Sequence, residues 1–170
     1  TLKPRLPNNY SMYNFPAMES VTYFARALGA ARSGNVTMAN QALEKLMEFQ
    51  KRAEKTSAYW AKQIEIQRLS AMAWIMYQEG KKKEALMVMQ QAAELESSTE
   101  KHPVTPGEIL PARELLGDML LDMGLYREAQ IEYETALRRS PNRFNSLYGA
   151  GLAAELGNNK SGAVLYYKKI

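Results

Sequence analysis

The chain has 170 residues, no cysteine, one histidine and a formal net charge of +4. Without cysteine there is no disulfide framework, thiolate metal site or cysteine nucleophile, and His102 alone does not suffice for a zinc site built on several histidines. The small positive charge does not indicate nucleic-acid binding, and no run of about 18 apolar residues predicts a membrane span, so we expect neither a nucleic-acid partner nor a transmembrane helix.

Proline interrupts the N-terminal segment, residues 1–16. Pro4, Pro7 and Pro16 argue against a stable helix there, because proline lacks a backbone donor and clashes with the preceding turn. We predict an extended arm or the end of a truncated preceding repeat. An arm that docks into another molecule is the alternative.

The two ends of the sequence suggest a piece of a longer protein. The sequence begins without an initiator Met, and it stops at Ile170 within an apparent helix. We therefore expect a longer parent protein whose targeting signal would lie outside these residues. The compartment, cytoplasmic or periplasmic, is not predicted.

Small residues recur along the rest of the chain at a fixed spacing, which is clearest in residues 110–143. With Leu110 as position 1, the residues at positions 7, 8, 15, 17, 20, 24, 27 and 32 are Leu116, Gly117, Gly124, Tyr126, Ala129, Tyr133, Ala136 and Pro141. This spacing is typical of a tetratricopeptide repeat, a pair of antiparallel helices with a period of about 34 residues.

The same spacing predicts further helix pairs within one solenoid domain, residues 17–170. In chain order the predicted repeats lie near residues 20–53, 66–99, 110–143 and 144–170. Their separations indicate two insertions. One is a loop over residues 97–109, which contains two prolines and a glycine. The other, around residues 52–65, has neither proline nor glycine and should lengthen the flanking helices.

Steric requirements explain the pattern. Small side chains at positions 8 and 20 let the two helices of a pair approach closely. The glycine at position 15 adopts the left-handed conformation that ends the first helix, a role that Asn158 takes in the last copy. We therefore predict an all-α fold, an α–α superhelix of about four helix-turn-helix repeats.

Several segments of the sequence resemble known proteins beyond the spacing of the repeat. Residues 24–34, 59–60, 65–69, 100–107, 110–119, 140–144 and 147–150 are similar to a group of bacterial tetratricopeptide-repeat proteins. The resemblance covers most of residues 15–170 and implies a bacterial source and this fold. It supplies no catalytic residues, because no activity is assigned to that group, whose repeats usually form the C-terminal part of a longer chain.

In such a superhelix the first helix of each pair lines an inner groove, at positions 2, 5, 9, 12 and 13. The residues that we select as the candidate peptide-binding groove are Gln67, Trp74, Tyr77, Gln78, Glu114, Asp118, Asp122, Tyr148 and Glu155. Acids beside aromatic rings favour a protein or peptide that carries Lys or Arg next to apolar residues. Alternatively, the aromatic rings pack against a neighbouring repeat and the acids form a solvated surface.

The signals for catalysis are weak. Residues 157–162 superficially resemble a phosphate-binding loop, but Asn159 stands where glycine is required before the lysine, so a turn is predicted. Glu114, Asp118 and Asp122 share one helical face, yet no histidine or further ligand joins them, so we predict no metal, cofactor or enzymatic activity.

These observations predict a non-enzymatic scaffold that binds a protein or peptide. The alternative is a structural or self-association module that positions another domain of a larger bacterial protein. Val164, Leu165 and Tyr167 in the last helix would be available for contact with a second copy.

Overall fold

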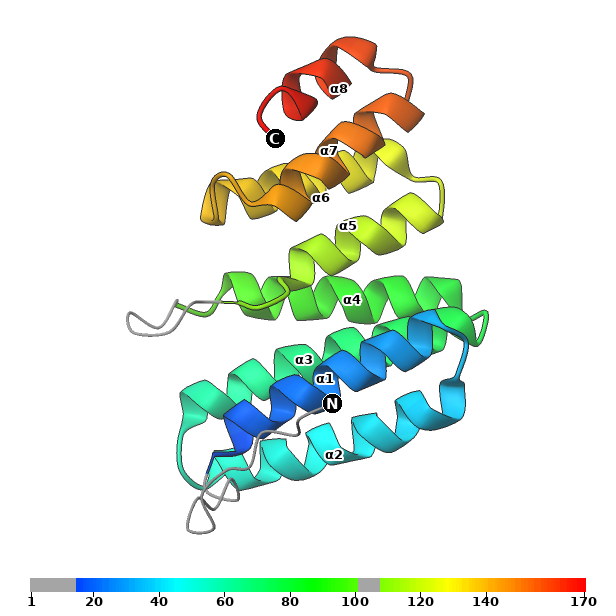
Figure 1. The fold of residues 1–170 in the computed structure, drawn as a ribbon. Coiled ribbons are helices and arrows are strands. Elements are labelled where there is room, and N and C mark those ends of the chain that lie inside the picture. Colours follow the sequence, from blue (N-terminus) through cyan, green and yellow to red (C-terminus); the bar gives the residue numbers. More distant parts are fainter. Residues whose placement is uncertain (1–14, 101–107) are drawn as a thin grey trace, which may run out of the picture.

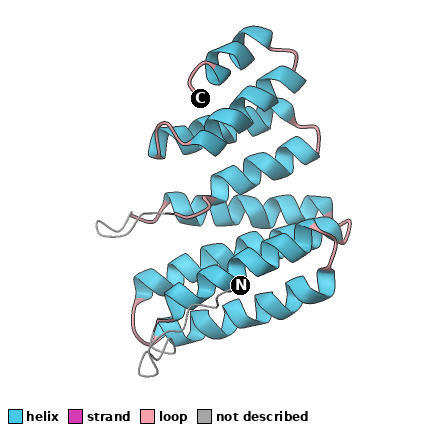
Figure 2. Ribbon diagram, in the orientation of Figure 1, coloured by secondary structure: helices cyan, strands magenta, loops and turns pink. Residues whose placement is uncertain are grey.

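The computed structural model describes residues 15–100 and 108–170, which form eight α-helices and no strand (Figures 1 and 2). The helices are α1 (Pro16–Arg32), α2 (Val36–Glu54), α3 (Ala58–Gln78), α4 (Lys82–Ser97), α5 (Ala112–Asp122), α6 (Tyr126–Arg139), α7 (Phe144–Leu156) and α8 (Lys160–Tyr167). The predicted all-α superhelix of helix-turn-helix pairs is confirmed.

The helices stack in chain order from α1 and α2 at one end to α8 at the other (Figure 1). Each helix packs against the next, and the odd-numbered helices also pack against one another, α1 on α3, α3 on α5 and α5 on α7. The odd-numbered helices therefore form a continuous wall, which we call the inner wall. None of the helices in the described ranges is long and apolar enough to cross a membrane.

Most of the segment expected to form an arm lies outside the described residues. Pro16, however, is the first residue of α1, where its fixed φ suits the first turn and no backbone donor is needed. The helical part of the chain therefore starts within the predicted arm. The predicted loop at 97–109 lies mostly outside the described residues, and Ser97 still belongs to α4.

The insertion predicted around residues 52–65 is helical apart from a short turn at residues 55–57. As expected from its lack of proline and glycine, α2 and α3 are long helices of 19 and 21 residues. Ser57 ends the turn by accepting a hydrogen bond from the Trp60 backbone N–H.

The turns within the helix pairs use the expected left-handed residues. Gly34, Gly80 and Gly124 have φ angles of 81°, 82° and 76°, and Asn158 takes the equivalent place in the last pair with a φ of 62°. Glycine adopts this conformation without a steric penalty, and asparagine tolerates it better than other side chains. The repeat pattern therefore located each of these turns.

Close approach of the helices depends on glycines that face tyrosine rings. A Cβ atom at Gly117 would lie 2.7 Å from the ring of Tyr133, and a Cβ atom at Gly151 would lie 2.5 Å from the ring of Tyr167. In each pair the glycine and the tyrosine are 16 residues apart in the sequence. The second pair follows the first by 34 residues, which is one period of the repeat. Tyr133 also meets Gly149, so its ring fills the gap between α5 and α7.

Candidate binding groove on the inner wall

The inner wall has a hollow of about 490 Å³ near α5 and α7, which we call the inner hollow. From α5 it is lined by Glu114, Asp118, Leu121 and Asp122, and from α7 by Tyr148, Leu152 and Leu156. Arg32 reaches it from the end of α1, and Tyr133 reaches it from α6. Of the predicted site residues, the structure thus brings together Glu114, Asp118, Asp122 and Tyr148.

Asp118 is the most constrained carboxylate on the rim of the hollow. Its Oδ1 accepts a hydrogen bond of 2.6 Å from the hydroxyl of Tyr133, and its Oδ2 lies 3.0 Å from Nη1 of Arg32. Burial raises the pKa of the Tyr133 phenol, and the adjacent Asp118 charge adds to that rise. Tyr133 therefore remains a hydrogen-bond donor that fixes Asp118 in place.

Trp74 corrects the sequence expectation, because it does not present its ring in the groove. Its exposed fraction is 1%, and it belongs to the core between the helices. The guanidinium carbon of Arg32 lies 4.6 Å from the Trp74 ring centroid, and the edge of the ring meets Tyr77. The alternative considered from the sequence, packing against a neighbouring repeat, is the one found for Trp74.

Glu114 is a second correction, because its charge is used within the fold. Only 2% of the residue is exposed, and its Oε1 accepts hydrogen bonds from Arg143 Nε at 2.6 Å and from Ser146 Oγ. Arg143 also donates to the carbonyl oxygen of Ile109. Glu114 therefore joins α5 to the start of α7 at the floor of the inner hollow, beneath the surface that a ligand would meet.

Asp122 is the carboxylate that remains available. It is exposed and has no hydrogen-bond or ion-pair partner among the described residues. Partial burial raises the pKa of its carboxyl, while the nearby charge of Arg32 lowers it and that of Asp118 raises it. Tyr77 on α3 lies near this acid: burial, then the Asp122 charge, raises the pKa of the Tyr77 phenol.

Tyr148 provides the aromatic side of the hollow. The residue is 48% exposed, and its ring stacks parallel to that of Phe144 with centroids 6.3 Å apart. Leu152 and Leu156 follow it at four-residue spacing, so they share its face of α7. This face, defined by Tyr148, Leu152 and Leu156, is the apolar strip of the hollow.

The remaining predicted residues lie outside the inner hollow. Gln67 is half-buried with its Oε1 unpartnered, and Gln78 is exposed at the end of α3. Glu155 is exposed and accepts a hydrogen bond of 2.8 Å from the hydroxyl of Tyr167. Together with burial, this bond raises the pKa of Tyr167 to about 12.

Arg32 was missed by the sequence analysis. Counted from Ser20 as position 1, it stands at position 13 of the first copy, one of the positions that face the groove. Applying the groove positions to this least regular copy would have found it. Its charge opposes that of Asp118, so the inner hollow is less acidic than its carboxylates alone suggest.

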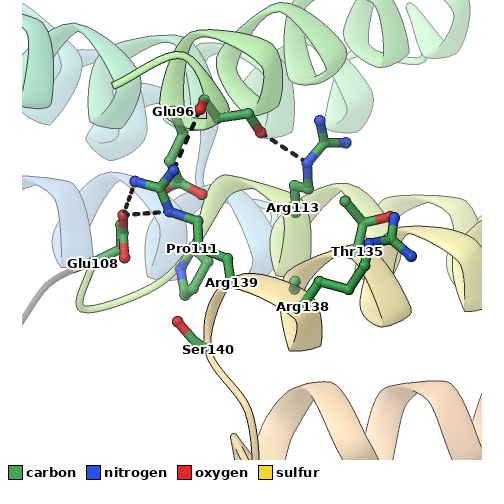
Figure 3. A pocket seen from close by; sticks show the side chains of 10 residues that line it. Glu96, Glu108, Pro111, Arg113, Thr135, Arg138, Arg139 and Ser140 are labelled. Atoms are coloured by element: carbon green, nitrogen blue, oxygen red, sulfur yellow. Dashed lines mark hydrogen bonds and ion pairs between the residues drawn. The ribbon is translucent and has the colours of Figure 1, made fainter. Parts of the chain in front are cut away.

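A second hollow, of about 320 Å³, lies between α4, α5 and α6, and we call it the junction hollow (Figure 3). Arg139 Nη2 donates to Glu108 Oε1 at 2.9 Å and to the carbonyl oxygen of Thr99 at 2.7 Å. Arg113 pairs with Glu94 and Glu132 at 2.7 and 2.6 Å. These arginines connect the end of α4 to the two following helices.

Glu96 is the buried acid of the junction hollow. It is 4% exposed and accepts a hydrogen bond of 2.9 Å from the backbone N–H of Ala112, the first residue of α5. Burial raises the pKa of Glu96 to about 7, although this backbone bond acts in the opposite direction. Glu96 therefore caps α5 from a neighbouring helix.

The acids of the inner hollow do not converge as metal ligands. Within the described residues there is no group of three or more histidine, aspartate or glutamate side chains placed to hold one ion. Glu114 and Asp118 share a helix face with Asp122 but are each held by separate partners.

Comparison with known proteins supports the fold. No family model matches the sequence, and no curated protein matches it. A solved structure described as "Crystal structure of MamA protein" has a TM-score of 0.53 at 18% identity, covering 88% of this chain and 88% of that chain. Another, "MamA RS-1 ArsTM double mutant", has the same TM-score and identity, covering 91% and 73%.

The likeness to MamA is one of fold, a helical solenoid of the tetratricopeptide type. Identity this low carries no function from one chain to the other. The predicted tetratricopeptide-like architecture is therefore shown. Membership in the bacterial group that the sequence resembles stays a prediction.

Proposed function

We propose that this chain is a non-enzymatic scaffold that binds a protein or peptide on its inner wall. The inner hollow receives a segment in which Lys or Arg stands beside apolar side chains. The observation that carries the proposal is the unpaired Asp122, which shares the hollow with the exposed apolar strip on α7.

Charge complementarity favours a cationic partner. Glu114 is paired with Arg143 and Asp118 with Arg32, so Asp122 is the carboxylate of the hollow without an ion-pair partner among the described residues, with Lys82 as a more distant cation. Its raised pKa reflects partial loss of water, and a cation from the partner would restore favourable interactions for its charged form. Carboxylates arranged in this way direct association and select against acidic segments.

The apolar strip supplies the contact area. Tyr148 and Leu156 are 48% and 45% exposed and lie on one face of α7, so they form an exposed apolar patch beside Asp122. Aromatic side chains of this kind dominate binding energy when a partner excludes water from them. Stacked helical repeats offer extended surfaces for such contacts.

Peptide-array binding tests the proposal. Asp122→Lys and Tyr148→Ala should each lower binding of basic-apolar peptides by about tenfold or more. The matched controls are Glu128→Lys and Met87→Ala, which alter exposed residues on α6 and α4 outside the hollow and should bind like the parent chain. Equal binding by all four variants would remove the inner hollow as the binding site.

A second candidate function is that of a structural module, which associates with itself or positions another domain of a longer protein. Self-association is favoured by exposed apolar side chains within and after α8: Val164, Leu165 and Ile170 are 52%, 56% and 49% exposed. Light scattering coupled to size-exclusion chromatography tests it. Dimers that dissociate in Leu165→Glu would support self-association, whereas a concentration-independent monomer would exclude it for this chain.

A further inference from the structure

The molecule places a cation of its own on the inner wall. Arg32 is the last residue of α1, yet its Nη1 lies 3.0 Å from Oδ2 of Asp118, which is 86 residues away on α5. Its guanidinium carbon lies 4.6 Å from the centroid of the Trp74 ring on α3. One arginine at the end of α1 thus contacts the next two helices of the inner wall, α3 and α5.

The groups around this guanidinium are those of a cation-binding site. A carboxylate provides the opposite charge, and the face of a tryptophan provides the strongest aromatic surface for a cation. Asp118 is already oriented by the Tyr133 hydroxyl at 2.6 Å. Because the Tyr133 ring is confined by Gly117 and Gly149, the carboxylate stays in place when the cation leaves.

The Arg32–Asp118 pair is open enough to be exchanged. The Arg32 and Asp118 side chains are 47% and 32% exposed, whereas the corresponding fractions for Arg143 and Glu114 are 26% and 3%. Ion pairs with that much exposure are weak, so an incoming cation can compete for Asp118. The Glu114 carboxylate is too deeply buried for an incoming cation to compete with Arg143 in the same way.

We propose that Arg32 occupies a cation subsite formed by Asp118 and the Trp74 ring, and that an arginine side chain of the bound partner takes this subsite by displacing Arg32. The proposal rests on the proposed function, because it names the partner group that the inner hollow selects. Arginine fits better than lysine, since its planar guanidinium both stacks on a ring and pairs with a carboxylate. Arg32 then competes with the partner's arginine for the subsite and lowers the apparent affinity of the chain for that partner.

Trp74 provides a direct readout that needs no natural partner. The chain has two tryptophans, so Trp60→Phe leaves Trp74 as the single one. In this background Arg32→Ala should uncover the ring and shift its emission to longer wavelength. N-acetyl-arginine amide should reverse the shift, whereas the neutral isostere N-acetyl-citrulline amide should not.

Two further variants in the same background, together with the background chain itself, control the experiment. Adding Asp118→Asn to Arg32→Ala should abolish the response to the arginine probe. Arg26→Ala removes the same charge from α1, where Arg26 lies 5.1 Å over the Tyr23 ring, and should behave like the background chain. The background chain itself should need about tenfold more arginine probe than Arg32→Ala, because its own arginine competes.

The outcomes separate this inference from the proposed function. Equal responses to the arginine probe with and without Arg32, or an equal response to citrulline, would overturn the inference. If array binding still depended on Asp122 and Tyr148, the binding function would stand without it. Should Arg32→Ala unfold, Arg32→Gln and the indole N–H resonance of Trp74 give the same test by nuclear magnetic resonance.

Discussion

The inner hollow and the junction hollow both contain acidic side chains and arginine, but they differ in how these charges are used. In the junction hollow, Arg139 and Arg113 each bind more than one acceptor and connect α4 to α5 and α6. In the inner hollow, Asp122 has no partner among the described residues and an apolar strip is exposed beside it. Satisfied charges indicate a structural joint, and unsatisfied ones beside apolar surface indicate a place for a ligand.

The largest expected effect comes from breaking the floor of the inner hollow. Arg143→Ala should lower the free energy of unfolding by about 3 kcal/mol, because Glu114 would keep a buried charge without its partner. Arg32→Ala breaks the exposed ion pair with Asp118, which lies on α5 like Glu114, and it should lower the free energy of unfolding by less than about 1 kcal/mol. Chemical denaturation measures both, and equal losses would contradict the distinction between floor and rim.

The next effect concerns the pH dependence of the junction hollow. The folded-state pKa of Glu96, about 7, exceeds its ordinary value of 4.5, so the folded protein binds the proton more tightly. This contribution to stability is complete below about pH 4.5 and is lost as the pH rises through 7. Glu96→Gln should therefore remove a decline of about 3 kcal/mol between pH 4.5 and pH 8.

Thermal denaturation across that pH range tests the Glu96 prediction. Glu94→Gln is the matched control, because the Glu94 side chain is 72% exposed on the same helix and should leave the decline intact. A decline that persists in Glu96→Gln would assign the pH dependence to other groups.

A smaller effect sharpens the comparison between tight and open packing. Gly117→Ala should destabilise the chain by about 1 to 2 kcal/mol, because the new methyl group would press on the Tyr133 ring. A Cβ atom at Gly29 in α1 would have no atom within 4 Å. Gly29→Ala should therefore stabilise the chain by about 0.5 to 1 kcal/mol, because alanine has the higher helix propensity. Melting temperatures that shift in the same direction would argue against the close approach at Gly117.

The smallest expected change in stability is at the unpaired acid. Asp122→Asn should alter the free energy of unfolding by no more than about 0.5 kcal/mol, since no ion pair or hydrogen bond is lost. A loss of 2 kcal/mol would mean that Asp122 supports the fold, and its proposed role in binding would then lose its basis.

Periodicity in the sequence predicted the fold because each small residue has a local steric purpose. Gly34, Gly80 and Gly124 fall where the chain must turn, and Gly117 falls where Tyr133 must enter. These requirements depend on neighbours within one helix pair, so a fixed spacing reveals them. The helix pairs could therefore be predicted from sequence.

The binding surface was harder to predict because it depends on contacts between pairs. Trp74 and Glu114 occupy groove positions, yet Arg32 and Arg143, from other helix pairs, cover or neutralise them. Position within a repeat gives the direction of a side chain but not what lies above it. Only the stacked structure shows that Asp122 and Tyr148 stay accessible while Trp74 does not.

Tyr133 makes the inner wall mechanically dependent on the outer helix that carries it. Its hydroxyl holds Asp118 while its ring is wedged against Gly117 of α5 and Gly149 of α7. One aromatic side chain of α6 thus connects α5 and α7 at a single point and orients a carboxylate there. Any substitution of Tyr133 would therefore disturb both the packing of these helices and the placement of Asp118.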